Sequence, residues 1–352
     1  MPIKYPTWSP DMLGADFQNL RLPLGPDPDH ENSLAIPELI ATLLRYCPAE
    51  SIDSSTDSGQ PVSEFSKRPA ILWVHGLSDY FFQAHVAEAF HAAGYAFYAL
   101  DLRKCGRSLL AGQSPHWVSN LELYYEELNL AAQLIQDFGH RFLVPLGHST
   151  GGLILALWVA DLPRQTSGQA TKLSKFIKAL ILNSPWTDFQ YPLLKARGIL
   201  AISLVLGKIW PKMPIDDGGL DLYGESIHRN FHGEWDYDLK LKPLAGHQKY
   251  LGWLRSVLLG QRRIRRGGLN IQIPVLTLCA ADSFKPQQYS SRVQYADVVL
   301  DSSQIQNRAP LMGPRSSLYV LEGAIHDVFL SRSPVRETAL QQSFEWLSQT
   351  SS

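Results

Sequence analysis

The sequence predicts an α/β fold: a mostly parallel central sheet, flanked by helices on both faces and interrupted by an inserted helical lid. Short, continuously apolar runs alternate with amphipathic segments along most of the 352 residues. Continuous apolar strands are typical of parallel sheets that are buried on both faces. The alternation stops between Trp186 and Gly268 and then resumes. An insertion at that place is expected to cover the carboxyl ends of the strands, where ligands bind in open α/β sheets.

The composition is that of a globular chain and excludes several classes of protein. Hydrophobic residues make up 45% and charged residues 18%, which excludes global disorder. A formal net charge of −1 gives no reason to expect nucleic acid as a partner. The three cysteines lie far apart without a CxxC pair, which indicates free thiols in a reducing compartment. Because no apolar signal segment opens the chain, we expect a cytoplasmic protein.

The chain divides into four expected parts. Residues 1–64 form an N-terminal extension with the first strands, 65–185 the first part of the core, 186–268 the lid, and 269–352 the second part of the core. Within the extension, the apolar run Leu39–Pro48 predicts an early strand. The stretch Ser51–Ser66 is rich in Ser, Asp, Gly and Pro and predicts a flexible loop.

Short apolar runs bounded by turn residues predict the remaining strands, and apolar residues at helical spacing predict the helices. The predicted strands are Ala70–Gly76, Tyr95–Leu102, Phe142–Gly147, Ala179–Pro185, Ile273–Ala280 and Ser317–Gly323. The predicted helices are Phe81–Ala93, Val118–Phe138, Gly151–Leu162, Leu193–Lys208, Tyr250–Arg266 and Thr338–Ser348.

The strongest chemical signal is the pentapeptide Gly147-His148-Ser149-Thr150-Gly151 between a predicted strand and a predicted helix. In this context the pattern G-x-S-x-G forms a tight turn that exposes the serine hydroxyl above the sheet. The following helix start supplies N–H groups and the positive end of a dipole. Ser149 is therefore the predicted nucleophile. The alternative is a glycine-rich turn in which the serine only caps the helix.

A serine hydroxyl needs a base, and an oxyanion needs donors. His326 follows the last predicted strand, which brings it to the same edge of the sheet as Ser149, and it is the predicted base. The turn His75-Gly76-Leu77 ends the strand next to that of the nucleophile. We expect the backbone N–H groups of Leu77 and Thr150 to form the oxyanion hole, and His75 to have a structural role in the turn.

Five segments together resemble the α/β-hydrolase superfamily, and within it the monoacylglycerol lipase and lysophospholipase group, also called serine aminopeptidase-like. They are HGLSDYF, ALDLRKCGRSL, GHSTGG, LILNSPW and EGAIHDVFLS. The resemblance covers roughly residues 65–350, although DLRKCGRS departs from the usual DxRGxGxS. It implies an α/β-hydrolase fold, no cofactor, and a Ser-Asp-His triad on Ser149, His326 and one aspartate between them. Because the sequence has no HExxH, P-loop or paired His-carboxylate ligand set, we also expect neither metal nor nucleotide.

Two aspartates compete for the third place in the triad. Asp282 directly follows the strand Ile273–Ala280, where this fold usually places its acid. Asp297 lies in YADVVLD, which is similar to the Ala-Asp-x-x-x-Asp turn of the lipase group. Its distance of 29 residues from His326 leaves room for one helix and one strand. We favour Asp297, keep Asp282 as the alternative acid, and note Asp301 as a third candidate.

The predicted function is a serine hydrolase that cleaves a carboxylic ester, of the lipase, esterase or lysophospholipase type, through an acyl-enzyme intermediate. Its partner would be a small-molecule ester with an apolar acyl chain. The alternatives are a peptidase or amidase on the same triad, or a non-catalytic binding protein with a hydrolase fold. The apolar run Gly198–Gly207 and the arginines at positions 262, 263, 265 and 266 would allow a peripheral membrane contact through the lid. The alternative, which we favour, is a solvated helix end for the arginines and a lid helix packed on the core for the apolar run.

Overall fold

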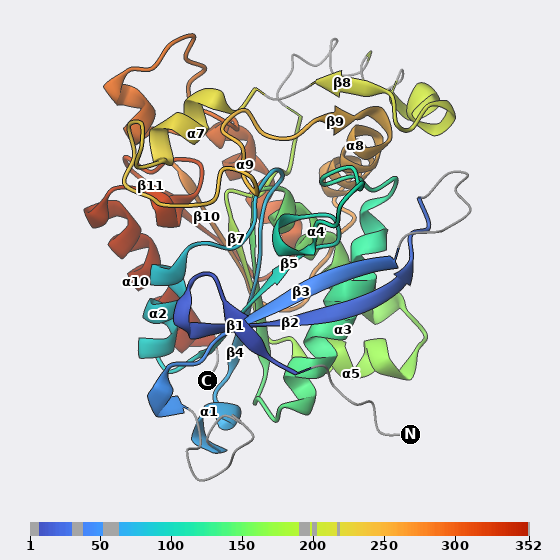
Figure 1. Ribbon diagram of the computed structural model, residues 1–352, viewed down its shortest axis with the longest axis vertical. Coiled ribbons are helices and arrows are strands. Elements are labelled where there is room, and N and C mark those ends of the chain that lie inside the picture. The colour runs from blue at the N-terminus through green and yellow to red at the C-terminus, as the bar shows by residue number, and fades with distance from the viewer. Residues whose placement is uncertain are drawn as a thin grey trace.

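The computed structural model describes residues 7–29, 38–51, 63–189, 198, 203–216 and 219–350. Its centre is a nine-stranded sheet in the order β1-β2-β3-β5-β4-β6-β7-β10-β11. The pairs β1–β2, β2–β3 and β3–β5 are antiparallel, and all pairs from β5 to β11 are parallel. The predicted fold class, a mostly parallel sheet flanked by helices, is confirmed (Figure 1).

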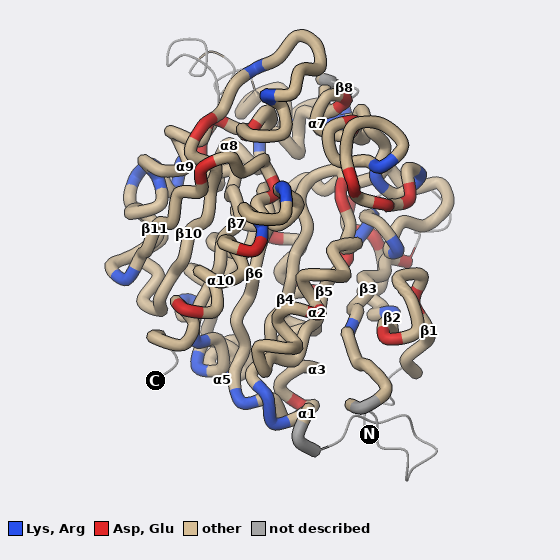
Figure 2. Tube along the Cα trace, turned by 90° about the vertical axis from the view of Figure 1, so that its left-hand side faces the viewer, with Lys and Arg blue, Asp and Glu red and all other residues tan. Residues whose placement is uncertain are grey.

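The strands of this sheet are β1 Ser9–Asp11, β2 Gly14–Pro26, β3 Glu38–Tyr46, β4 Ala70–Val74, β5 Ala96–Asp101, β6 Leu143–His148, β7 Leu180–Asn183, β10 Val275–Ala280 and β11 Ser316–Leu321. Strands β8 Pro214–Asp216 and β9 Lys249–Tyr250 form a separate antiparallel pair. The central strands β4, β6 and β7 contain no Lys, Arg, Asp or Glu and are buried throughout (Figure 2). Burial on both faces explains their continuous apolar sequence.

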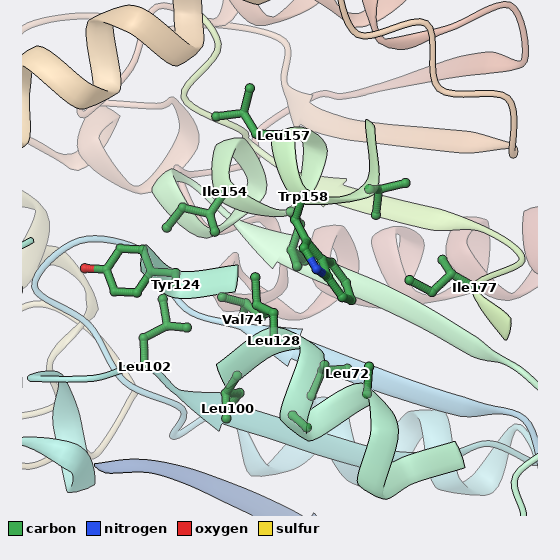
Figure 3. Packing of buried hydrophobic residues seen from close by; sticks show 14 of the residues in the cluster. Leu72, Val74, Leu100, Leu102, Tyr124, Leu128, Ile154, Leu157, Trp158 and Ile177 are labelled. Atoms are coloured by element: carbon green, nitrogen blue, oxygen red, sulfur yellow. The ribbon is translucent and has the colours of Figure 1, made fainter. Parts of the chain in front are cut away.

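The helices are α1 Ser63–Lys67, α2 Ala84–Ala92, α3 Tyr125–Asp137, α4 Thr150–Asp161, α5 Gly168–Phe176, α7 Asp221–Ile227, α8 Leu251–Arg265, α9 Ser302–Arg308 and α10 Ser333–Thr350. Helices α3, α4 and α5 pack on one face of the sheet, and α2 and α10 on the other. Figure 3 shows the first of these cores, in which Leu72 and Leu100 from the sheet face Leu128 of α3 and Trp158 of α4. The two cores fix the sheet and therefore the position of every strand end.

The elements between Trp186 and Gly268 lie above the carboxyl edge of the sheet, at the top of Figure 1. They include α7, α8 and the pair β8–β9. Of the predicted helix Leu193–Lys208, residues 203–208 are helical, and of the rest only residue 198 is described. In the described part of the chain, no helix is both long enough and apolar enough to span a membrane.

Several predicted bounds differ from the structure. The predicted helix Phe81–Ala93 begins only at Ala84, because the N–H of Phe81 donates to the Asp101 carboxylate and that of Phe82 to the Gln83 side chain. The predicted helix Val118–Phe138 starts as a 3-10 turn at Leu121–Tyr124 before α3. Most of the predicted loop Ser51–Ser66 lies outside the described residues, and its last four residues begin α1.

Candidate active site

Ser149 stands at the turn between β6 and α4 in a strained backbone conformation, with φ at 53° and ψ at −116°. A positive φ is uncommon for a residue with a side chain and typically costs about 1–3 kcal/mol. Three backbone hydrogen bonds hold it: the Ser149 N–H donates to Asn183 O at 2.9 Å, and the Ser149 carbonyl accepts from the N–H groups of Leu153 and Trp186. The turn therefore presents the hydroxyl in one fixed direction.

The glycines of the pentapeptide are required by close backbone approach. A Cβ on Gly147 would lie 2.7 Å from the Gly151 carbonyl oxygen. One on Gly151 would lie 2.5 Å from the Val74 carbonyl oxygen, in the neighbouring strand β4. No real Cβ fits at such distances, so larger residues at either position would displace the turn. This is the tight strand-to-helix turn that the sequence predicts.

The structure brings Ser149, His326 and Asp297 together in one line of hydrogen bonds. His326 Nε2 lies 3.0 Å from Ser149 Oγ, and His326 Nδ1 lies 2.8 Å from Asp297 Oδ2. Since a carboxylate only accepts, Nδ1 carries the proton and the lone pair of Nε2 faces the serine hydroxyl. All three side chains are buried, Asp297 completely.

Asp297 is held in place from two sides. Its Oδ1 accepts the backbone N–H groups of Val299 and Leu300, both at 2.8 Å, which leaves Oδ2 for His326. Its own N–H donates to the Asp282 carbonyl at 2.9 Å, and a bridge pairs Ser283 with Asp297. The segment after β10 thus carries Asp297 to the histidine.

The two other candidate acids occupy different places. The Asp282 side chain is exposed. Its backbone carbonyl accepts hydrogen bonds from the Asp297 N–H and from the Ser302 hydroxyl. The Asp301 carboxylate caps α9 by accepting the Ser303 N–H at 3.0 Å. Of the three aspartates, only Asp297 is hydrogen-bonded to His326.

Leu77 and Thr150, the predicted oxyanion donors, both line the cavity above Ser149. Thr150 is the first residue of α4, where backbone N–H groups have no acceptor within the helix. The turn that carries Leu77 packs against the serine, since a Cβ on Gly76 would lie 3.1 Å from Ser149 Cβ. His75 has a structural place there: its Nε2 accepts the Leu102 N–H at 3.1 Å.

A cavity of about 570 Å³ opens above the serine hydroxyl. One part of its wall is apolar and comes mostly from the segment after β7 and from α8: Trp186, Leu220, Leu251, Trp253, Leu254, Val299 and Leu300. The other part is polar and is formed by Ser78, Asp79, His148 and Lys242. The cavity can therefore hold a ligand with an apolar body and a polar end.

The polar part of the wall contains a buried ion pair that joins the core to the segment above it. Lys242 Nζ lies 2.7 Å from Asp79 Oδ1, and His148 Nδ1 lies 3.4 Å from Asp79 Oδ2. Burial alone would raise the pKa of the Asp79 carboxyl. The Lys242 ammonium, followed by His148, outweighs burial and holds that pKa well below its usual range. Asp79 is therefore a carboxylate at every pH at which the protein would be assayed.

Sequence reasoning missed a buried network directly behind His326. Asp327 is fully buried, and its carboxylate accepts from Asn183 Nδ2 at 2.6 Å and from Gln83 Nε2 at 3.0 Å. Asn183 also holds the Ser149 N–H through its backbone carbonyl. The network thus connects the loop of the histidine to the turn of the serine. Its sequence signals were the polar Asn183 at the end of the apolar run LIL and the acidic Asp327 directly after His326.

The described residues contain no group of three or more His, Cys, Asp or Glu side chains that could hold a metal ion. Asp101, the last residue of β5, binds Arg107 at 2.9 Å and accepts the Phe81 N–H, so its carboxylate has a structural role. Arg103, two residues further along, pairs with Glu127.

Comparison with known proteins gives a matching family model and a relative named as a lipase. Residues 66–330 match the family model described as serine aminopeptidase, S33. The monoacylglycerol lipase of Mycolicibacterium smegmatis is 28% identical over 197 residues, which cover 55% of this chain. The match spans 62% of that relative's length, less than two thirds.

Solved structures share the fold. A soluble variant of monoglyceride lipase from Saccharomyces cerevisiae, in complex with a substrate analog, superposes with a TM-score of 0.60 at 17% identity, covering 92% of this chain and 95% of that one. A thermostable carboxyl esterase from Bacillus coagulans gives a TM-score of 0.61 at 13% identity, covering 96% and 99%. At such identities the likeness concerns the fold alone, and it agrees with the predicted fold class.

Proposed function

We propose that this chain, which belongs to the serine aminopeptidase S33 family, hydrolyses a carboxylic ester through an acyl-enzyme intermediate. One observation carries the proposal: the hydrogen-bonded line from Ser149 Oγ through the His326 ring to the buried Asp297 carboxylate. This is the arrangement in which a histidine activates a serine and an aspartate fixes the histidine.

In the first half of the proposed reaction, Ser149 Oγ attacks the ester carbonyl carbon while His326 Nε2 takes the hydroxyl proton. Asp297 accepts from Nδ1, which fixes the tautomer and stabilises the imidazolium. The N–H groups of Leu77 and Thr150 receive the carbonyl oxygen as it becomes negative. The C–O bond of the ester then breaks, the leaving alcohol takes the proton from His326, and the acyl group stays on Ser149.

The second half repeats these steps with water. His326 Nε2 takes a proton from a water molecule, whose oxygen attacks the acyl carbonyl carbon. The oxyanion again lies against the two backbone N–H groups. The bond to Ser149 Oγ breaks, the serine recovers its proton from His326, and the carboxylic acid leaves. His326 returns every proton that it accepts, so the cycle needs no cofactor.

We propose a monoacylglycerol-like ester as the substrate. The apolar wall of the cavity, with Trp253, Leu254 and Leu300, suits an acyl chain. The polar wall, with Ser78 and the pair of Asp79 and Lys242, offers donors and acceptors to a leaving alcohol that carries further hydroxyl groups. The relatives named as monoacylglycerol or monoglyceride lipases support this class of substrate.

We further propose that residues 186–268 act as the lid of this cavity. The segment supplies much of the apolar wall, including Trp186, Leu251 and Trp253. Beside the cavity it is tied to the core by polar contacts that include the Lys242–Asp79 pair and the hydrogen bond from the His247 N–H to the Ser78 hydroxyl. The same segment remains our proposed place for a peripheral membrane contact.

The proposed location is the cytoplasm. Cys47, Cys105 and Cys279 are all free and buried. Free thiols of this kind are usual in a reducing compartment.

An aminopeptidase activity is the second candidate, because the family description names one. Such an enzyme needs a carboxylate for the terminal ammonium of its substrate. Among the described residues, Asp79 is the acid that lines the cavity near Ser149, but Lys242 already neutralises it at 2.7 Å. The ester is therefore the favoured substrate.

The test compares monoacylglycerols of increasing acyl length with aminoacyl p-nitroanilides, using the native protein and Ser149→Ala. We expect ester hydrolysis by the native protein alone, with kcat/KM rising with acyl length before levelling off, since each buried CH₂ contributes about 0.8 kcal/mol. Hydrolysis of the anilides alone would favour the aminopeptidase. No turnover of either, or turnover that survives in Ser149→Ala, would contradict the proposal.

A further inference from the structure

A second cavity, of about 620 Å³, lies against α8 apart from the candidate active site. The active-site cavity meets only the first turn of α8, through Leu251, Trp253 and Leu254. The second cavity meets the helix from Arg255 to its end. Residues three and four apart lie on one face of a helix, so Arg255, Leu259, Arg262 and Arg266 form a single stripe along this wall.

The other walls of the second cavity are fixed against α8. The turn at Ser119–Glu122 is held by the Leu121 N–H, which donates to Ser256 Oγ at 2.7 Å. The segment Gly207–Pro211 presses on the helix so closely that a Cβ on Gly207 would lie 3.0 Å from Arg255 Cβ. The Gly252 N–H donates to Pro211 O at 2.8 Å. The hollow is thus built from three segments with defined mutual contacts.

The lining of this cavity is strongly basic. Of the described residues that line it, five are basic, Lys208, Arg255, Arg262, Arg263 and Arg266, and one is acidic, Glu122. Arg263 is neutralised by Asp161, at 2.7 Å and 2.8 Å. Arg255 donates its Nε to the Leu204 carbonyl, which carries no charge. Within the described chain, Lys208, Arg262 and Arg266 form no ion pair.

We propose that this second cavity binds the phosphate group of an organic phosphate. Unpaired cations around a concave site concentrate anions, and guanidinium groups bind phosphate oxygens in pairs. A carboxylate would be satisfied by one arginine, whereas a phosphate, with up to two negative charges and three oxygens, can engage several. The polar groups of Ser119 and Asn120 and the apolar side chains of Leu157 and Leu259 line the remaining space, where the organic part would lie.

The phosphate could come from a free metabolite or from a lipid headgroup, and the chemistry of the cavity is the same for both. Ile209 and Trp210, in the segment that forms one wall, are both 58% exposed and apolar. Exposed apolar side chains beside a basic hollow suit a headgroup at a membrane surface. The experiment therefore includes one arm for each source.

Binding is measured on the full chain by titration calorimetry with glycerol 3-phosphate, and by sedimentation with vesicles of phosphatidylcholine that contain or lack phosphatidic acid. We expect saturable binding of at least one phosphate probe. Glycerol 3-phosphate binding identifies a free ligand, and binding only to phosphatidic acid vesicles identifies a lipid. Arg262→Gln/Arg266→Gln should lower the affinity by about tenfold or more for each arginine.

The matched control is Arg141→Gln/Arg315→Gln, which removes two exposed arginines near the amino ends of β6 and β11. It changes the net charge equally and should leave the affinity unchanged. If the double variant is unstable, the single variant Arg266→Gln, at an exposed position, replaces it in the binding measurements. Binding of neither probe, binding unchanged in the cavity variants, or an equal loss in the control would overturn the proposal. None of these outcomes depends on ester hydrolysis.

Discussion

Two buried histidines, His140 at the amino edge of the central sheet and His326 at the carboxyl edge, are held differently. At the amino edge, His140 Nδ1 donates to the Arg68 carbonyl at 3.0 Å and Nε2 accepts from the Tyr98 hydroxyl at 2.8 Å. At the carboxyl edge, His326 shares its nitrogens with Asp297 and Ser149 and lines a cavity. The His140 ring has both nitrogens bonded within the core, whereas the His326 ring faces a cavity in which a substrate can react.

The carboxyl edge also carries strain and buried charge next to the serine. Ser149 holds a positive φ there, and the ion pair of Asp79 and Lys242 lies beside it. Among the described residues, His148 Nε2 and Thr150 Oγ1 are buried without a hydrogen-bond partner. Such groups are costly unless a ligand meets them. A rigid sheet thus supports an unfavourable arrangement at one edge, where the proposed chemistry lies.

The largest expected effect separates the two candidate acids. Asp297→Asn should lower kcat by about 10⁴-fold, because an amide no longer fixes the tautomer of His326. Asp282→Asn, the matched control, should stay near native activity because its side chain is exposed. Ester kinetics with circular dichroism as a check of folding measure both. A large loss in Asp282→Asn with near-native Asp297→Asn would reverse the assignment.

The second effect concerns the ion pair that joins the core to the segment above it. Lys242→Met leaves the Asp79 carboxylate buried without its cation, which typically costs about 3–5 kcal/mol of stability. Asp79→Asn/Lys242→Met removes both charges and should recover most of that loss. Urea unfolding of the two single variants and the double variant gives the coupling. If the loss of unfolding free energy in the double variant equals the sum of the losses in the two single variants, the two charges are not coupled.

The third effect tests the amino edge. Burial lowers the pKa of His140 from 6.5 to about 4. Between these values the unfolded chain binds a proton that the folded chain does not, so stability should fall as pH falls from 6.5 to 4, by about 3 kcal/mol from this group. His140→Gln should remove that share of the pH dependence and leave kcat unchanged. An unchanged slope of unfolding free energy against pH would show that His140 is not the cause.

The smallest effect concerns the apolar wall. Leu254→Trp fills part of the active-site cavity and should shorten the longest acyl chain accepted, at about 0.8 kcal/mol in kcat/KM for each CH₂ excluded. Leu259→Trp on the same helix faces the second cavity and is the control. Short esters should be cleaved by both variants at native rates. An equal change of chain preference in both would remove Leu254 from the acyl-binding wall.

What the sequence could predict was local. The strands β4, β5, β6, β7, β10 and β11 and the turn at Ser149 follow from apolar runs and glycines that are adjacent in the chain. The resemblance to the monoacylglycerol lipase group was likewise readable from short segments, and the family comparison agrees with it. Strand β2, with four polar residues and two prolines within its thirteen residues, lacked such a run and was not predicted individually.

What the sequence could not predict depends on contacts between distant segments. Asn183 meets Asp327 across 144 positions and Lys242 meets Asp79 across 163, which no local pattern records. The choice between Asp282 and Asp297 stayed open for the same reason. It depends on the bridge between Ser283 and Asp297, which turns one carboxylate inward while the other stays exposed.

The central claim is that Ser149 is a nucleophile activated by His326. Intact-mass spectrometry after reaction with a fluorophosphonate tests it most directly, because the probe reacts with an activated serine and not with an ordinary hydroxyl. The account predicts one adduct on the native protein, located at Ser149 by peptide mapping, and none on Ser149→Ala. An adduct of equal yield on Ser149→Ala, or no adduct on the folded native protein, would contradict it.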